Sequence, residues 1–85
     1  MSAARVRVLV RDGCHLCEEA LAVVERVCAE TGDGWVVEDV DGDPELLRRY
    51  SDQVPVTFVD DRQHDFWRVD ADRLRRALTA QAPRG

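Results

Sequence analysis

Two cysteines, Cys14 and Cys17, are the residues whose type and spacing can do chemistry in this chain. Side chains three residues apart on a helix have Cβ atoms about 5–6 Å apart, which is close to the range of a disulfide before any local adjustment. The thiolate is the nucleophile in disulfide exchange, and the free N–H groups at a helix start favour it. The spacing therefore predicts a reversible dithiol, with Cys14 as nucleophile and Cys17 as resolving partner.

The elements expected around this pair form a βαβ unit. Valines alternate with other residues over 5–11, which predicts a buried strand, and apolar residues three and four apart predict a helix over 14–30. A β-branched segment over 35–40 predicts a second strand. Strand, helix and strand in about 36 residues indicate two parallel strands with a right-handed crossover. The dithiol would then lie where the first strand passes into its helix.

The second half is expected to contain a helix, a hairpin and a helix, over residues 44–52, 55–60, 63–69 and 71–80. Asp43 is suited to cap the first of these helices, with Pro44 at its first position, and Asp70 is suited to cap the last. The two-residue link Asp61-Arg62 permits only an antiparallel hairpin. The predicted order is βαβαββα in one α/β domain over residues 1–85.

Charge and composition narrow the classes of partner. The 85 residues contain 12 basic and 17 acidic side chains, and the net charge is -5. An acidic chain repels a phosphate backbone, so nucleic acid is not expected as a partner. No apolar run approaches the length of a membrane helix, and the opening segment is too short and too interrupted by arginine for a signal peptide. We expect a cytoplasmic monomer without a membrane contact, whose cysteines are kept reduced.

Three segments together resemble the small glutaredoxin-like proteins of the thioredoxin superfamily: Gly13-Cys14-His15-Leu16-Cys17-Glu18-Glu19-Ala20, Asp41-Gly42-Asp43-Pro44-Glu45-Leu46 and Val54-Pro55-Val56. The resemblance covers about Arg5 to Leu78. It implies a thioredoxin-like fold, with a four-stranded mixed sheet flanked by helices. It also implies a cis Val54-Pro55 bond beside the dithiol, with the backbone of Val54 pairing with substrate. We count Val54, Pro55 and His15 as expected substrate contacts.

The expected function is reduction of disulfides in proteins or in low-molecular-weight compounds. We expect no bound cofactor, with glutathione or another low-molecular-weight thiol as the reductant. One alternative is a binding or scaffold module of the same fold with idle thiols. A metal-binding domain is a weaker alternative, because zinc prefers four ligands while Cys14, Cys17 and His15 supply three at most. We therefore assign no metal ligands.

Three other residues have simpler interpretations. Cys28 lies about 16 Å along the helix from Cys17, too far for a bridge, and is expected to be a buried core thiol. His64 lies in the hairpin and is expected on the ordinary surface. For Trp67 two interpretations stay open: a partly covered core aromatic, or an exposed ring at the hairpin end that belongs to a docking surface.

Overall fold

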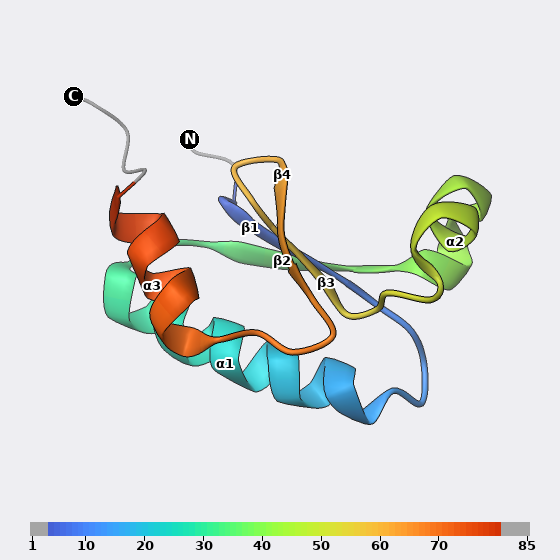
Figure 1. The fold of residues 1–85 in the computed structure, drawn as a ribbon, viewed down its shortest axis with the longest axis horizontal. Coiled ribbons are helices and arrows are strands. Elements are labelled where there is room, and N and C mark those ends of the chain that lie inside the picture. The colour runs from blue at the N-terminus through green and yellow to red at the C-terminus, as the bar shows by residue number, and fades with distance from the viewer. Residues whose placement is uncertain (1–3, 81–85) are drawn as a thin grey trace.

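The computed structural model describes residues 4–80, which form a four-stranded sheet with three α-helices (Figure 1). In chain order the elements are β1 (Val6–Val10), α1 (His15–Thr31), β2 (Trp35–Asp39), the 3-10 turn η1 (Val40–Gly42), α2 (Pro44–Tyr50), β3 (Val56–Val59), β4 (Arg62–Phe66) and α3 (Ala71–Ala80). The predicted βαβαββα order is confirmed, with η1 as an addition. The mixed sheet flanked by helices has the thioredoxin-like fold.

The strands lie in the order β2-β1-β3-β4. β1 is parallel to β2 and antiparallel to β3, and β3 is antiparallel to β4. β1 is an inner strand with both faces covered, and Val6, Val8 and Leu9 are fully buried. In the β1–β3 pairing Leu9 lies opposite Val56, so the end of β1 and the start of β3 share one end of the sheet.

Helices cover the two faces unequally. α1 and α3 pack together on one face, over a cluster that includes Val6, Val24 and Leu74 (Figure 1). α2 covers part of the other face, where Tyr50 meets Phe58 edge to face at 5.8 Å between ring centroids. No residue of the short α2 is fully buried. The larger core therefore lies between the sheet and the α1–α3 pair.

Local side-chain chemistry explains where the helices begin and end. Asp43 accepts hydrogen bonds from the N–H groups at the start of α2, and Asp70 does the same for α3, so both predicted caps are confirmed. Gly32 caps the end of α1 directly after Thr31. Its φ of 81° suits a residue without a Cβ atom, and its N–H donates to the Cys28 carbonyl at 2.8 Å.

The hairpin turn differs from the prediction by one residue. Asp60 and Asp61 form it, with φ of 52° and 67°, and Arg62 already pairs with Val59 in the ladder. Both turn residues are left-handed, as a two-residue type I′ turn requires, and aspartate tolerates that conformation better than most residues. The prediction of Asp61-Arg62 was therefore wrong in register, although the antiparallel hairpin is confirmed.

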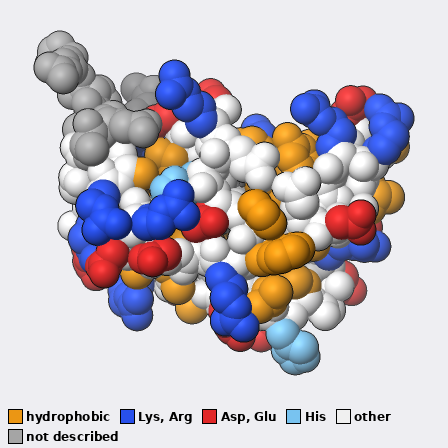
Figure 2. Space-filling view, in the orientation of Figure 1, with side chains coloured by type: hydrophobic (Ala, Val, Ile, Leu, Met, Phe, Trp, Pro, Cys, Tyr) orange, Lys and Arg blue, Asp and Glu red, His pale blue; other side chains and the backbone are white. Residues whose placement is uncertain are grey.

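Part of the apolar surface remains exposed. Phe66 and Trp67 at the end of β4 and Val36 and Val37 on the edge strand β2 are the large hydrophobic side chains exposed among the described residues. Figure 2 shows hydrophobic side chains gathered near the middle of the face in view, over the end of β4 and beside the start of α1. No helix within residues 4–80 combines the length and the apolar character that crossing a bilayer requires.

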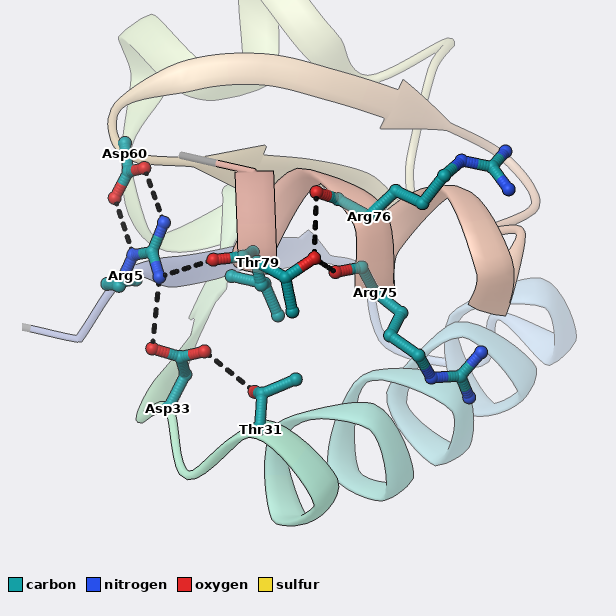
Figure 3. Close-up of polar contacts among 8 residues, drawn as sticks. Arg5, Thr31, Asp33, Asp60, Arg75, Arg76 and Thr79 are labelled. Atoms are coloured by element: carbon teal, nitrogen blue, oxygen red, sulfur yellow. Dashed lines mark hydrogen bonds and ion pairs between the residues drawn. The ribbon is translucent and has the colours of Figure 1, made fainter. Parts of the chain in front are cut away.

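Arg5 joins four parts of the fold at the end of the sheet where β1 begins (Figure 3). Its guanidinium donates to both carboxylate oxygens of Asp60 at 3.0 and 2.9 Å, to Asp33 at 3.3 Å and to the Leu78 carbonyl at 2.9 Å. Asp33 is held in turn by the Thr31 hydroxyl at 2.6 Å. The hydrogen bonds from Arg5 to Asp60, together with the charge of Arg5, hold the pKa of Asp60 below its usual range. Arg5 thereby connects β1, the end of α1, the β3–β4 turn and α3.

Candidate active site

The dithiol lies where β1 passes into α1, because a glycine lets the chain turn there. Gly13 has a φ of 73°, in the left-handed region that favours glycine. Cys14 follows in an extended conformation as the N-cap of α1, and His15 is the first helical residue. The sequence placed Cys14 inside the first turn, so the helix starts one residue later than predicted.

Cys14 occupies a position usually taken by Ser, Thr, Asp or Asn. Its Sγ accepts a hydrogen bond from the backbone N–H of Cys17 at 3.1 Å. This N–H is one of the free donors at the helix start, where the aligned peptide dipoles also favour negative charge. Cys14 is partly exposed, and both cysteines are free thiols. The Cys14 sulfur is therefore reached by solvent and accepts a backbone N–H at the start of α1.

Cys17 has the opposite environment. Only 3% of its surface is exposed, because it belongs to the buried face of α1. The pKa of the Cys17 thiol is raised from 9.0 to about 11. Burial is the largest cause, and the hydrogen bond with the Cys14 sulfur acts in the same direction, while a hydrogen bond with the Arg11 backbone opposes both. At neutral pH Cys17 is a protonated, protected thiol beside an accessible one.

The cis Val54-Pro55 bond implied by the resemblance is present. Val56 follows it and lies opposite Leu9, so the bond sits at the end of the sheet from which the dithiol loop departs. Pro55 is buried and its carbonyl accepts a hydrogen bond from Trp67 N–H at 2.8 Å. Val54 is half-buried, and no other residue within 4–80 makes a hydrogen bond to its backbone N–H or carbonyl.

Trp67 is the site residue that sequence reasoning left undecided. Half of its surface is exposed, and its indole Nε1–H donates to the Asp52 carbonyl at 3.0 Å. Its φ of 64° is left-handed, which nothing in its residue type indicates. Arg68, the next residue, pairs with Glu19 on α1 at 3.3 Å. The segment after β4 therefore touches both the loop before Pro55 and the dithiol helix.

Three residues remain: His15 lies beside the dithiol, and Cys28 and His64 lie away from it. His15 is exposed next to Cys14. Cys28 is buried as predicted, with 2% of its surface exposed, and burial raises its pKa to about 11. His64 corrects the prediction of an ordinary surface residue. It is half-buried against α3, its Nε2 has no hydrogen-bond partner among the described residues, and burial followed by the charge of Arg73 lowers its pKa.

Groups of three or more His, Cys, Asp or Glu side chains with the spacing of a metal site are absent from the described part of the chain.

Comparisons with known proteins agree with this architecture. Solved structures of a structural-genomics target protein from X. campestris and of a protein from Nitrosomonas europaea each superpose with a TM-score of 0.73. The first is 31% identical and is aligned over 92% of this chain and 99% of its own. The second is 33% identical and is aligned over 87% and 89%.

Sequence comparison places the chain in a family. Two proteins described as uncharacterized, from Mycobacterium tuberculosis and Mycobacterium bovis, are each 35% identical over 80 residues, which is 88% of this chain and 82% of theirs. The family model described as Glutaredoxin-like domain (DUF836) matches residues 5–79, which include the dithiol, the cis proline and all three helices nearly to their ends. This chain belongs to the glutaredoxin-like domain family.

Proposed function

We propose that this protein is a dithiol–disulfide oxidoreductase that reduces disulfides through Cys14 and Cys17. The observation that carries the proposal is the asymmetry of the pair: Cys14 Sγ is accessible and accepts the Cys17 N–H at the start of α1, while the Cys17 thiol is buried with a pKa of about 11. An attacking thiolate beside a protected thiol is the arrangement that two-step exchange needs.

In the first step the Cys14 thiolate attacks one sulfur of a substrate disulfide. A bond forms between Cys14 Sγ and that sulfur, the substrate S–S bond breaks, and the other substrate sulfur leaves as a thiolate. Because Cys17 is buried, a substrate disulfide in solution reaches Cys14 first, and Cys14 is the residue that forms the mixed disulfide.

In the second step Cys17 attacks Cys14 Sγ in the mixed disulfide. Cys14 carries no negative charge in that intermediate, so the part of the Cys17 pKa shift that comes from Cys14 is removed and deprotonation becomes easier. The Cys14–Cys17 disulfide forms and the substrate sulfur leaves as a thiol after protonation. The substrate gains two electrons and the protein loses two.

The loop before Pro55 and the exposed His15 are proposed as substrate contacts. The backbone N–H and carbonyl of Val54 are free of hydrogen bonds within residues 4–80, so they are available to an extended substrate segment beside Cys14. The loop before Pro55 is anchored, because Pro55 is buried and its carbonyl accepts a hydrogen bond from the Trp67 N–H at 2.8 Å.

Return to the dithiol requires an external reductant. We assign this role to a low-molecular-weight thiol such as glutathione, two molecules of which become a disulfide as Cys14 and Cys17 regain their protons. The proposal needs no bound cofactor, no metal and no nucleic acid. It places the protein, as a monomer, in the cytoplasm, where a reducing thiol pool exists.

Redox titration with mass-spectrometric detection tests the proposal. Wild-type protein should show a reversible two-electron couple between about -120 and -270 mV, the range of known dithiol oxidoreductases. Cys17→Ser should retain a partner on Cys14 as a stable mixed disulfide, while Cys28→Ser should behave as wild type. A protein that forms no Cys14–Cys17 bridge under oxidant, or whose Cys17→Ser variant traps nothing that wild type releases, would favour the idle-thiol scaffold instead.

A further inference from the structure

Phe66 and Trp67 form an exposed aromatic pair, which we call the aromatic surface. Their rings meet edge to face with centroids 5.0 Å apart, yet 43% and 50% of their surfaces remain exposed. The apolar side chains in Figure 2 gather in this region of the molecule. Two adjacent large aromatic side chains left in water are typical of an interaction site, since Trp and Tyr or Phe dominate the energetics of many interfaces.

Two hydrogen bonds fix the position of Trp67. Its backbone N–H donates to Pro55 at 2.8 Å, and its indole donates to the Asp52 carbonyl at 3.0 Å. These bonds maintain a left-handed φ of 64° that a bulky residue rarely adopts. The indole is therefore held against the loop that ends in Val54, with half of the residue's surface exposed.

The aromatic surface also adjoins the dithiol helix. Arg68, next to Trp67, pairs with Glu19 at 3.3 Å, and Val69 shares with Leu16 and Ala20 the lining of a small cavity of about 150 Å³. Leu16 lies between the two cysteines in sequence. The aromatic surface thus lies between the loop over residues 52–55 and the first turns of α1.

Charge distinguishes the ligands that this region can accept. Asp12 and Glu18 flank Cys14, and Asp52 borders the loop; all three are exposed and none forms an ion pair with another described residue. The nearby cations Arg11 and Arg68 are each already paired with a carboxylate, at 3.4 and 3.3 Å. The surroundings of Cys14 are therefore net negative.

We infer that the aromatic surface and this acidic border select, as substrate, an oxidised polypeptide segment with apolar and basic side chains beside its disulfide. This inference rests on the proposed function and names its substrate class. An apolar side chain of the segment covers Phe66 and Trp67, its backbone lies along Val54, and its basic side chains approach Asp12, Glu18 and Asp52. An anionic small-thiol disulfide covers neither ring and meets like charge.

Three disulfides test the inference with the reduced full-length protein. One is a short peptide disulfide with Phe and Lys around the cysteine, the second has Glu in place of Lys, and the third is uncharged hydroxyethyl disulfide. The cationic peptide should be reduced about 10-fold faster than the anionic one at low salt, with the ratio falling toward one in 0.5 M NaCl, because exposed charges are screened. The hydroxyethyl disulfide rate should show little dependence on salt.

Variants then locate the selectivity. Trp67→Gly suits the left-handed φ and keeps the backbone N–H that bonds Pro55 while removing the ring, and Phe66→Ala shortens its neighbour. Each should lower the ratio of the cationic-peptide rate to the hydroxyethyl disulfide rate by about 5- to 10-fold. Val36→Thr is the matched control: Val36 is 47% exposed, similar to the two aromatic residues, but lies on β2, and its variant should keep the wild-type ratio.

The outcomes distinguish a failure of the substrate inference from a failure of the proposed function. Wild-type protein that reduces hydroxyethyl disulfide but handles both peptides equally, or aromatic variants that keep the wild-type ratio, would overturn the substrate inference alone. Wild-type protein that reduces none of the three would overturn the proposed function together with it.

Discussion

Cysteine alkylation measures the environment of each thiol, and the structure predicts a definite order. The pKa values of Cys17 and Cys28 are each raised from 9.0 to about 11, mainly by burial. Two pH units correspond to roughly 100-fold less thiolate in the folded chain than in the unfolded chain at neutral pH. We therefore expect iodoacetamide to modify Cys14 first, and the other two at least 100-fold more slowly than in denatured protein.

The Cys14→Ser variant separates the effect of Cys14 on the Cys17 pKa from the effect of burial. Serine is a good N-cap, so the hydrogen bond from the Cys17 N–H is retained, but the substituted oxygen does not carry the charge that a Cys14 thiolate carries. The pKa of Cys17 should fall below about 11 and stay above 9.0, because burial, the largest cause, is unchanged. Cys28 is an internal control, since its shift comes from burial and from Asp33.

The assay follows the alkylation rate of each cysteine by mass spectrometry from pH 7 to 11. Equal rates for Cys14 and Cys17 at neutral pH would refute the accessible–protected asymmetry. A Cys17 with ordinary acidity in Cys14→Ser would show that burial is not the main cause of its shift.

Three further predictions concern stability. Between pH 9 and 11 the folded state keeps protons on Cys17 and Cys28 that the unfolded state has lost. The stability that these two thiols contribute should therefore be constant below pH 9 and then fall by up to about 1.4 kcal/mol per pH unit for each thiol, with Cys28→Ala halving the slope in urea titrations at each pH. Arg5→Lys should lower the free energy of unfolding by about 2–3 kcal/mol, because an ammonium cannot reproduce the forked contacts to Asp60; a loss below 0.5 kcal/mol would contradict the role given to this network. Gly32→Ala should cost about 1 kcal/mol in thermal or urea unfolding, entirely from its φ of 81°, since an added Cβ meets nothing within 4 Å; an unchanged midpoint would argue against the left-handed cap.

The order of elements and the position of the dithiol follow from the sequence because they depend on local interactions. Alternating and three-to-four-residue spacings distinguish strands from helices, and Asp43 and Asp70 cap helices through N–H groups two and three residues away. The same local rule places Cys14 at the start of α1, next to a free N–H that only a helix start supplies.

Tertiary structure decided what depends on residues far apart in the chain. Pairing of β1 with β3 brings Val54 and Pro55 to the same end of the sheet as Cys14. Burial of Cys17 on the inner face of α1 is the main cause that raises its pKa. The exposure of Trp67 also depends on the fold, because its two hydrogen bonds reach partners 12 and 15 residues earlier. Burial and the choice of partner arise only when distant segments pack, so no local pattern specifies them.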